Sequence, residues 1–153
     1  RIREVMTIPV VANGEIWTVD DALRCQAESG CQDLMLGRGI VADPGLAWRI
    51  RKAVAERRGE PMPAGYRDTT WPDLVPALLR FWELVCADLE PRQRAGRLKQ
   101  WLNLMRRSFP EAEAAYQHVR VMTDQRAITV WLDELQAQVQ AQKQAQMQVP
   151  QEA

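Results

Sequence analysis

The feature that most constrains the fold is a pair of short apolar segments, residues 8–12 and 33–36, separated by one helix-length stretch. A short apolar run of this kind is typical of a strand buried on both faces of a parallel sheet. Each run ends at a glycine turn, at residues 13–14 and 37–39. The order strand, helix, strand, helix predicts a parallel β/α sheet, which two strands cannot close alone. The chain is therefore expected to hold part of a larger α/β domain.

The two helices of this first region have recognisable ends. Thr18 followed by Asp21 is a capping box, and Gly30 stands where a C-terminal cap is expected. Asp43-Pro44 predicts the N-cap and first residue of the next helix, which ends near Gly59. Residues 1–60 thus form two successive β/α units. Because the chain starts at Arg1, a few residues before an apolar strand, we interpret its start as a cut.

The rest of the chain is predicted to be helical. Residues 61–72 are rich in Gly, Pro and polar groups and are interpreted as a linker. Residues 73–136 carry apolar stripes at helical spacing, and residues 137–153 form a Gln/Ala-rich tail expected to be a fraying helix or disordered. The predicted starts of the first three helices are Asp73, Pro91 and Ser108.

Composition bounds the class of protein. The 20 basic and 20 acidic residues cancel, so overall charge favours neither nucleic acid nor membrane as a partner, and 46% hydrophobic residues suffice for a core. No apolar run approaches the roughly 18 residues of a membrane span, and no signal peptide is recognised. An odd number of cysteines, three, suits a reducing compartment, and we expect a cytoplasmic protein. The single histidine, His118, has no metal-ligating neighbours in sequence, so no metal site is expected.

The two glycine turns follow successive strands and are therefore equivalent in position. In a β/α barrel, the loops after the last two strands form a common phosphate site. Glycine lets backbone N–H groups approach phosphate oxygens, and Arg38 can add a bidentate contact. Either loop alone is interpreted more simply as a tight turn, but the pair in register favours phosphate. Glu15 either binds ligand hydroxyls or caps its turn, and Trp17 either lines the cofactor site or, as favoured for most of the tryptophans, packs in the core.

A second candidate site is a local excess of positive charge. Residues 91–110 contain six basic residues and no acidic one. Most of the polar members share one helical face, opposite Leu98 and Leu102, which predicts a helix that packs on one side and contacts a polyanion on the other. The alternative is a solvated face paired with Glu90 or Glu111. The candidate RNA-binding residues are Arg92, Arg94, Lys99, Asn103, Arg106 and Arg107.

Two segments resemble a known family. Residues 8–16 (IPVVANGEI) and 33–39 (DLMLGRG) are similar to the seventh and eighth strands of the tRNA-dihydrouridine synthases, FMN enzymes with a barrel and a C-terminal helical domain. Residues 43–47 and 98–102 look most like the C-type subfamily, which modifies uridine 16 of tRNA. The resemblance covers nearly all of the chain except the tail. It implies that residues 1–60 are the last two β/α units of a TIM-type (β/α)8 barrel, followed by a helical bundle that binds tRNA.

The resemblance also implies functional residues. The FMN phosphate and ribityl region would be held by Asn13, Gly14, Glu15, Gly37 and Arg38. The family's catalytic cysteine lies on an earlier strand, so no catalytic residue is expected in this chain, and neither Cys25 nor Cys31 is assigned that role.

The implied reaction is reduction of the uridine C5=C6 bond by FMN that NADPH has reduced, in a parent enzyme expected to be monomeric. The fragment alone is expected to be inactive because its barrel is open. Two alternatives remain: a fragment of another FMN barrel, the old yellow enzyme class, whose final strand also ends in Gly-Arg, and a non-catalytic RNA-binding helical module.

Overall fold

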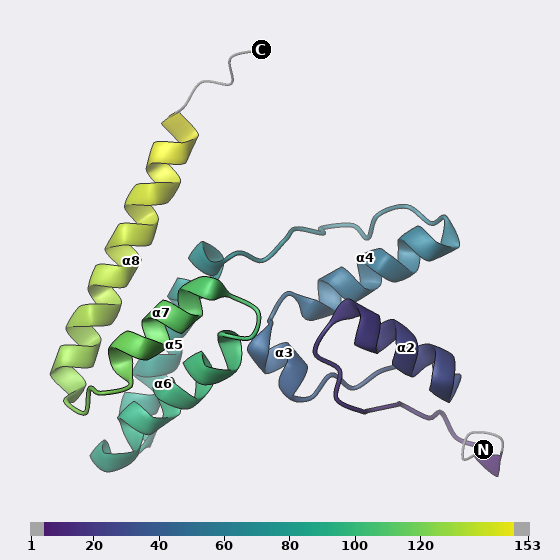
Figure 1. Cartoon of the computed structure of the whole chain (residues 1–153), viewed down its shortest axis with the longest axis horizontal. Helices are drawn as coiled ribbons and strands as arrows, with labels where there is room; N and C mark the ends of the chain where they lie inside the picture. The colour runs from purple at the N-terminus through teal and green to yellow at the C-terminus, as the bar shows by residue number, and fades with distance from the viewer. Residues whose placement is uncertain (1–4, 149–153) are drawn as a thin grey trace. The chain divides into compact units, whose positions relative to one another are not determined.

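The computed structural model describes residues 5–148 and divides the chain into two compact units, Arg1–Thr69 and Thr70–Ala153 (Figure 1). The boundary falls inside the segment 61–72 that was predicted to be a linker. The first unit contains α2 (Val19–Ser29), α3 (Arg38–Ala42) and α4 (Leu46–Arg58). The second contains α5 (Trp71–Asp88), α6 (Pro91–Met105), α7 (Pro110–Val119) and α8 (Gln125–Gln148).

The two predicted strands form only one parallel bridge, Ala12 with Leu34. Ala12 N donates to Asp33 O at 3.0 Å, and Met35 N donates to Ala12 O at 2.8 Å. The parallel direction agrees with the prediction, but no extended strand forms within residues 5–148. The prediction that these strands are buried on both faces is wrong, since Ile8 and Val11 are 63% and 55% exposed. A parallel strand needs paired neighbours and covered faces, and the described residues supply only one bridge.

In the first unit, both ends of α2 are as predicted, whereas only the C-terminal end of α4 is. Thr18 and Asp21 form the capping box of α2, and Gly30 ends it in the left-handed conformation. Gly59 ends α4 as predicted, but α4 begins at Leu46 rather than Pro44. Asp43 does not cap α4 because its buried carboxylate accepts from Gly45 N at 3.0 Å and pairs with Arg49. The apolar core of the unit is Ile16, Ala22, Leu46 and Ile50.

In the second unit, the helix starts partly differ from those predicted. Pro91 begins α6 as predicted. Thr70 caps α5, and Asp73 is the third helical residue of the capping box rather than the cap itself. Phe109 rather than Ser108 precedes α7, with Pro110 at its first position. Since Phe109 is buried in the core, apolar burial and the proline decide where α7 begins, rather than a hydroxyl cap.

The helix α8 continues through Gln148, so residues 137–148 of the Gln-rich tail are helical; residues 149–153 lie outside the described residues. Val139 on this segment is buried against the core. Lys143 Nζ lies 2.9 Å from Asp73 Oδ1, which ties α8 to the first turn of α5. Of the two alternatives expected for the tail, a fraying helix or disorder, this part forms a helix. Apolar residues are sparse there, but one buried valine and one ion pair hold the helix against α5.

Within this unit, α8 packs against α5 and α6, and α7 packs against α6 (Figure 1). Trp82 Nε1 donates to Thr129 Oγ1 at 2.9 Å, so the indole is hydrogen-bonded where α5 meets α8. The fully buried side chains include Val75, Leu78, Leu98, Leu102, Met105, Val119, Ile128 and Leu132.

We expect the Asp73→Asn substitution to remove a pH-dependent part of the stability of this unit. Hydrogen bonds from Thr70, followed by the contact with Lys143, lower the pKa of Asp73 to about 2 from 3.8. Because the folded-state pKa is depressed, the carboxylate contributes fully above the unfolded value and its contribution is lost as pH falls from about 3.8 to 2. Urea unfolding should show the advantage of the wild type over Asp73→Asn at pH 6 and its disappearance near pH 2. An advantage that does not change with pH would contradict this assignment.

Candidate functional site

The two glycine turns predicted to share a phosphate site lie against each other. An ideal Cβ on Gly39 would fall 1.9 Å from Ile16 O, so only glycine permits the backbones of the two loops to approach this closely. Gly37 adopts a positive φ of 55° just before α3. A pocket of about 230 Å³ opens between the loops, lined by Asn13, Glu15, Ile16, Trp17, Leu36, Gly37, Arg38 and Gly39. Of the five predicted cofactor residues, only Gly14 does not line it.

Three side chains form a connected group at this pocket. Glu15 Oε2 accepts from Trp17 Nε1 at 2.8 Å, and Glu15 Oε1 lies 2.5 Å from Arg38 Nη2. The guanidinium carbon of Arg38 lies 5.5 Å from the centroid of the Trp17 ring. Both charged side chains are largely exposed. Glu15 thus balances the charge of Arg38, while the indole supports the guanidinium from one side.

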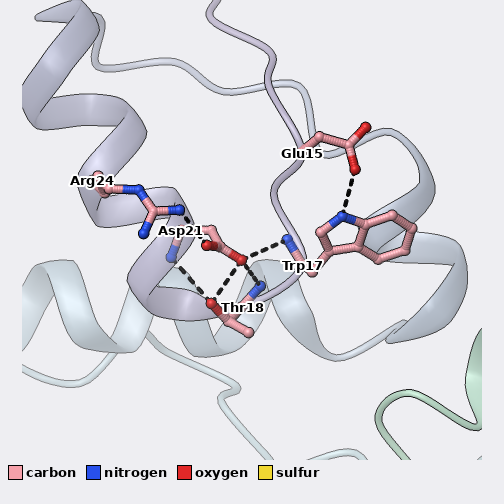
Figure 2. Close-up of polar contacts among 5 residues, drawn as sticks. All are labelled: Glu15, Trp17, Thr18, Asp21 and Arg24. Atoms are coloured by element: carbon pink, nitrogen blue, oxygen red, sulfur yellow. Dashed lines mark hydrogen bonds and ion pairs between the residues drawn. The ribbon is translucent and has the colours of Figure 1, made fainter.

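The start of α2 fixes the position of Trp17 (Figure 2). Asp21 Oδ2 accepts from the backbone N–H groups of Trp17 at 3.2 Å and Thr18 at 3.0 Å, and Asp21 Oδ1 pairs with Arg24 at 2.6 Å. The Thr18 hydroxyl bond, followed by the Trp17 amide, lowers the pKa of Asp21 below its ordinary value. Sequence reasoning favoured a core role for Trp17. The sequence did offer a signal that Trp17 lies beside Glu15: the two residues are two positions apart, and residues two apart in an extended segment point to the same side.

The groups at this pocket suit a ligand with an anionic end and hydroxyls. The Arg38 guanidinium and the Asn13 amide can donate to phosphate oxygens, and the Glu15 carboxylate can accept from hydroxyl groups. The backbone N–H of Gly39 donates to Leu36 O at 3.1 Å, so this expected donor is already used. An anion would therefore be bound mainly by Arg38. The guanidinium would then either contact the anion and Glu15 together or give up its ion pair with Glu15.

The predicted basic helix is α6, and its candidate residues differ in what they contact. Leu98 and Leu102 are buried in the core, while Arg92 and Asn103 are exposed and Lys99 is half-buried. Within residues 5–148, the side chains of Arg92 and Lys99 form no hydrogen bond or ion pair with another residue. Arg107 is exposed and follows the helix end. The helix α6 therefore buries Leu98 and Leu102 and exposes Arg92 and Asn103.

Arg94 and Arg106 are held by other parts of the unit. Arg94 is half-buried: its Nε donates to Leu89 O at 2.8 Å and its Nη1 donates to Gln125 Oε1. It therefore connects the end of α5 to the start of α8. Arg106 pairs with Glu113, Nε to Oε2 at 2.9 Å, rather than with either predicted acid, Glu90 or Glu111. Glu113 was not found from the sequence.

Comparison with known proteins adds independent evidence. The family described as "Dihydrouridine synthase (Dus)" matches residues 1–149. The chain belongs to the dihydrouridine synthase family. Curated relatives are named tRNA-dihydrouridine(16) synthase: the protein of Aquipseudomonas alcaligenes is 48% identical over 120 residues, 78% of this chain and 36% of the relative. The protein of Escherichia coli strain K12 is 37% identical over 123 residues, 80% of this chain and 35% of the relative.

The chain thus spans about a third of the length of these dihydrouridine synthases. The resemblance to the family and to its uridine-16 members is confirmed, and the old yellow enzyme class is set aside. Within residues 5–148, no helix has both the length and the apolar character needed to cross a membrane. Of the free cysteines, Cys31 is buried while Cys25 and Cys86 are half-buried, and none lines the pocket between the two loops.

Proposed function

We propose that this chain is the C-terminal part of a cytoplasmic, monomeric tRNA-dihydrouridine synthase that reduces the C5=C6 bond of a tRNA uridine, uridine 16 by analogy with its relatives. The observation that carries the proposal is the family match over residues 1–149, together with relatives that are named for this activity. The parent enzyme would use FMN, with NADPH as reductant. The chain alone would be inactive, since the catalytic cysteine would belong to the preceding part of the parent enzyme.

The pocket between the two loops is proposed to hold the phosphate and ribityl region of FMN. The residues would be Asn13, Gly14, Glu15, Gly37 and Arg38, at the end of a β/α barrel completed by the rest of the parent enzyme. Bound FMN would supply the hydride for the reduction. The support is the close packing of the loops at Gly39 and the exposed Arg38 guanidinium beside Glu15. Arg38 would bind the phosphate, and Glu15 would accept from ribityl hydroxyls.

The exposed side of α6 is proposed to bind the tRNA backbone. Support comes from Arg92 and Lys99, which have no acidic partner within residues 5–148, and from the polar Asn103 and the cationic Arg107 nearby. Because the side chains of Arg92 and Lys99 have no internal partner, phosphates that bind them can release counterions. Arg94 would contribute through the packing of the unit, because its guanidinium is engaged by Leu89 and Gln125. A helical unit that grips the backbone would help to draw the target base out of its stack.

The test is binding of the 153-residue chain to unmodified tRNA across a salt series. We expect Arg92→Ala with Lys99→Ala to weaken binding roughly tenfold and to reduce the salt slope by about two, because two phosphate contacts are lost. The matched control is Arg80→Ala with Arg126→Ala, which removes the same charge from α5 and α8. It should bind nearly as the wild type does.

Equal affinity and slope for both variants would contradict the RNA-binding role of α6 and leave it as a solvated face. The same titration with and without added FMN addresses the remaining alternative, because a non-catalytic RNA-binding module would bind tRNA with no dependence on FMN.

A further inference from the structure

The Arg106 side chain contacts two residues of α7 rather than extending freely into solvent. It follows α6 at the C-cap, and its guanidinium carbon lies 5.1 Å from the centroid of the Tyr116 ring on α7. Its Nε lies 2.9 Å from Glu113 Oε2, and the two side chains are 37% and 43% exposed. The cation is thus supported on one face and held at one edge while remaining accessible to a ligand.

The carboxylate that holds Arg106 is itself fixed. Glu113 Oε1 accepts from Gln117 Nε2 at 2.7 Å, one turn further along α7. Gln117 Oε1 in turn accepts from Arg120 Nη1 at 2.8 Å. Both oxygens of Glu113 are therefore engaged, and its position is set by α7 rather than by Arg106 alone.

The contact with Glu113 uses only one edge of the guanidinium. Apart from Glu113 and the Tyr116 ring, the guanidinium of Arg106 has no side-chain partner within residues 5–148, so its two terminal amino groups can turn to another ligand. These two groups form the fork that binds phosphate with two parallel hydrogen bonds. A long arginine side chain normally loses rotamer freedom when it binds, and an arginine that is already held loses less.

We propose that Glu113 is a positioning residue that, with Tyr116, holds the Arg106 fork ready for a tRNA phosphate. The inference rests on the proposed RNA-binding function of α6. It extends the binding surface from α6 to α7 and assigns an acidic residue a favourable role in binding a polyanion.

Charge alone and positioning predict opposite results for Glu113→Ala. Removal of a negative charge beside a basic surface should tighten RNA binding if Glu113 acts only by its field. If Glu113 positions Arg106, the substitution should instead weaken tRNA binding roughly threefold to tenfold, because the arginine must be ordered during binding. The salt slope should also fall by up to about one if the phosphate contact is lost.

The experiment measures tRNA binding of the 153-residue chain across a salt series for Glu113→Ala, Arg106→Ala and the double variant. Weaker binding by Glu113→Ala, with no further loss in the double variant relative to Arg106→Ala, is the expected result, because Glu113 would act through Arg106. Equal or tighter binding by Glu113→Ala, or a further loss in the double variant, would overturn the proposal. Circular dichroism melting shows whether each variant is folded.

A second pair of variants keeps the test decisive if Glu113→Ala does not fold. Tyr116→Phe keeps the ring beneath the guanidinium and should bind tRNA as the wild type does. Tyr116→Leu removes the ring and should bind roughly twofold to fivefold more weakly. Equal binding by these two variants would count against the arrangement.

The same measurements distinguish a failure of the positioning role of Glu113 from a failure of RNA binding by α6. If the wild type and the variant lacking Arg92 and Lys99 bind tRNA equally weakly, α6 does not bind RNA at all. If they differ while Glu113→Ala binds as well as the wild type, only the role of Glu113 is overturned.

Discussion

Gly39→Ala is expected to destabilise the first unit by about 2–4 kcal/mol, because the added methyl group has no space. The new Cβ would lie 1.9 Å from Ile16 O and 3.2 Å from Leu46 Cδ2. The first of these neighbours is backbone, which cannot turn aside as a flexible side chain can. The loops would have to separate, and the pocket beside Arg38 would open. We therefore expect loss of the local structure on which the proposed flavin site depends.

The measurement is peptide-resolved hydrogen exchange, which reports the two units separately. Amides of α2 and α4 should lose protection in Gly39→Ala, while amides of α5 and α8 keep theirs. Gly96→Ala is the matched control, since Gly96 lies in α6 and, apart from its chain neighbours and the nearby backbone of its own helix, no atom lies within 4 Å of its ideal Cβ. It should stabilise the second unit by about 0.5–1 kcal/mol through helix propensity. Wild-type protection of α2 in Gly39→Ala would show that the loops can part at little cost.

Leu98→Ala should destabilise the second unit by about 3–4 kcal/mol, since deletion of a fully buried leucine loses transfer free energy and leaves a cavity. Leu98 is 0% exposed in the core formed by the four helices. It lies on α6, the helix that also carries the basic surface. Loss of its packing would loosen the support of Arg92 and Lys99, and we expect weaker tRNA binding at temperatures near the unfolding midpoint.

Urea unfolding followed by circular dichroism measures this loss. The control is Leu84→Ala on α5, because Leu84 is 45% exposed and its truncation should cost less than about 1 kcal/mol. Similar losses for the two leucine variants would contradict the assignment of α6 to the centre of the core.

The sequence predicted best those features that depend on neighbours along the chain. The capping box of Thr18 and Asp21 forms as predicted, as do the glycine ends at Gly30 and Gly59. Pro91 begins a helix as predicted. Each of these signals acts within one turn of helix, so the local residues suffice to determine it.

Other features depend on partners distant in sequence or on a local signal that was placed wrongly. Asp73 was predicted to cap α5, but Thr70, three residues earlier, is the cap, and Asp73 completes its capping box. The pairing of Asp73 with Lys143, 70 positions away, had no signal in the sequence. The Gln-rich segment was predicted to be a fraying helix or disordered because it lacks an apolar stripe, and the helix that forms there has Val139 buried and Lys143 paired with Asp73. The strands at 8–12 and 33–36 were predicted from apolarity, yet a strand is stabilised by neighbours that residues 5–148 do not provide.

For the candidate sites, the sequence alone determined which residue types stand where: two glycine turns after equivalent segments, and a run of cations with apolar residues on the other face. Only the tertiary structure decided which of these groups meet. It packed Gly39 against Ile16, paired Arg38 with Glu15, engaged Arg94 in the packing of the unit and placed Arg106 between Glu113 and Tyr116. The reason is physical, since the charge of a side chain is fixed by its chemistry, whereas its availability to a ligand depends on partners that folding brings within a few ångströms.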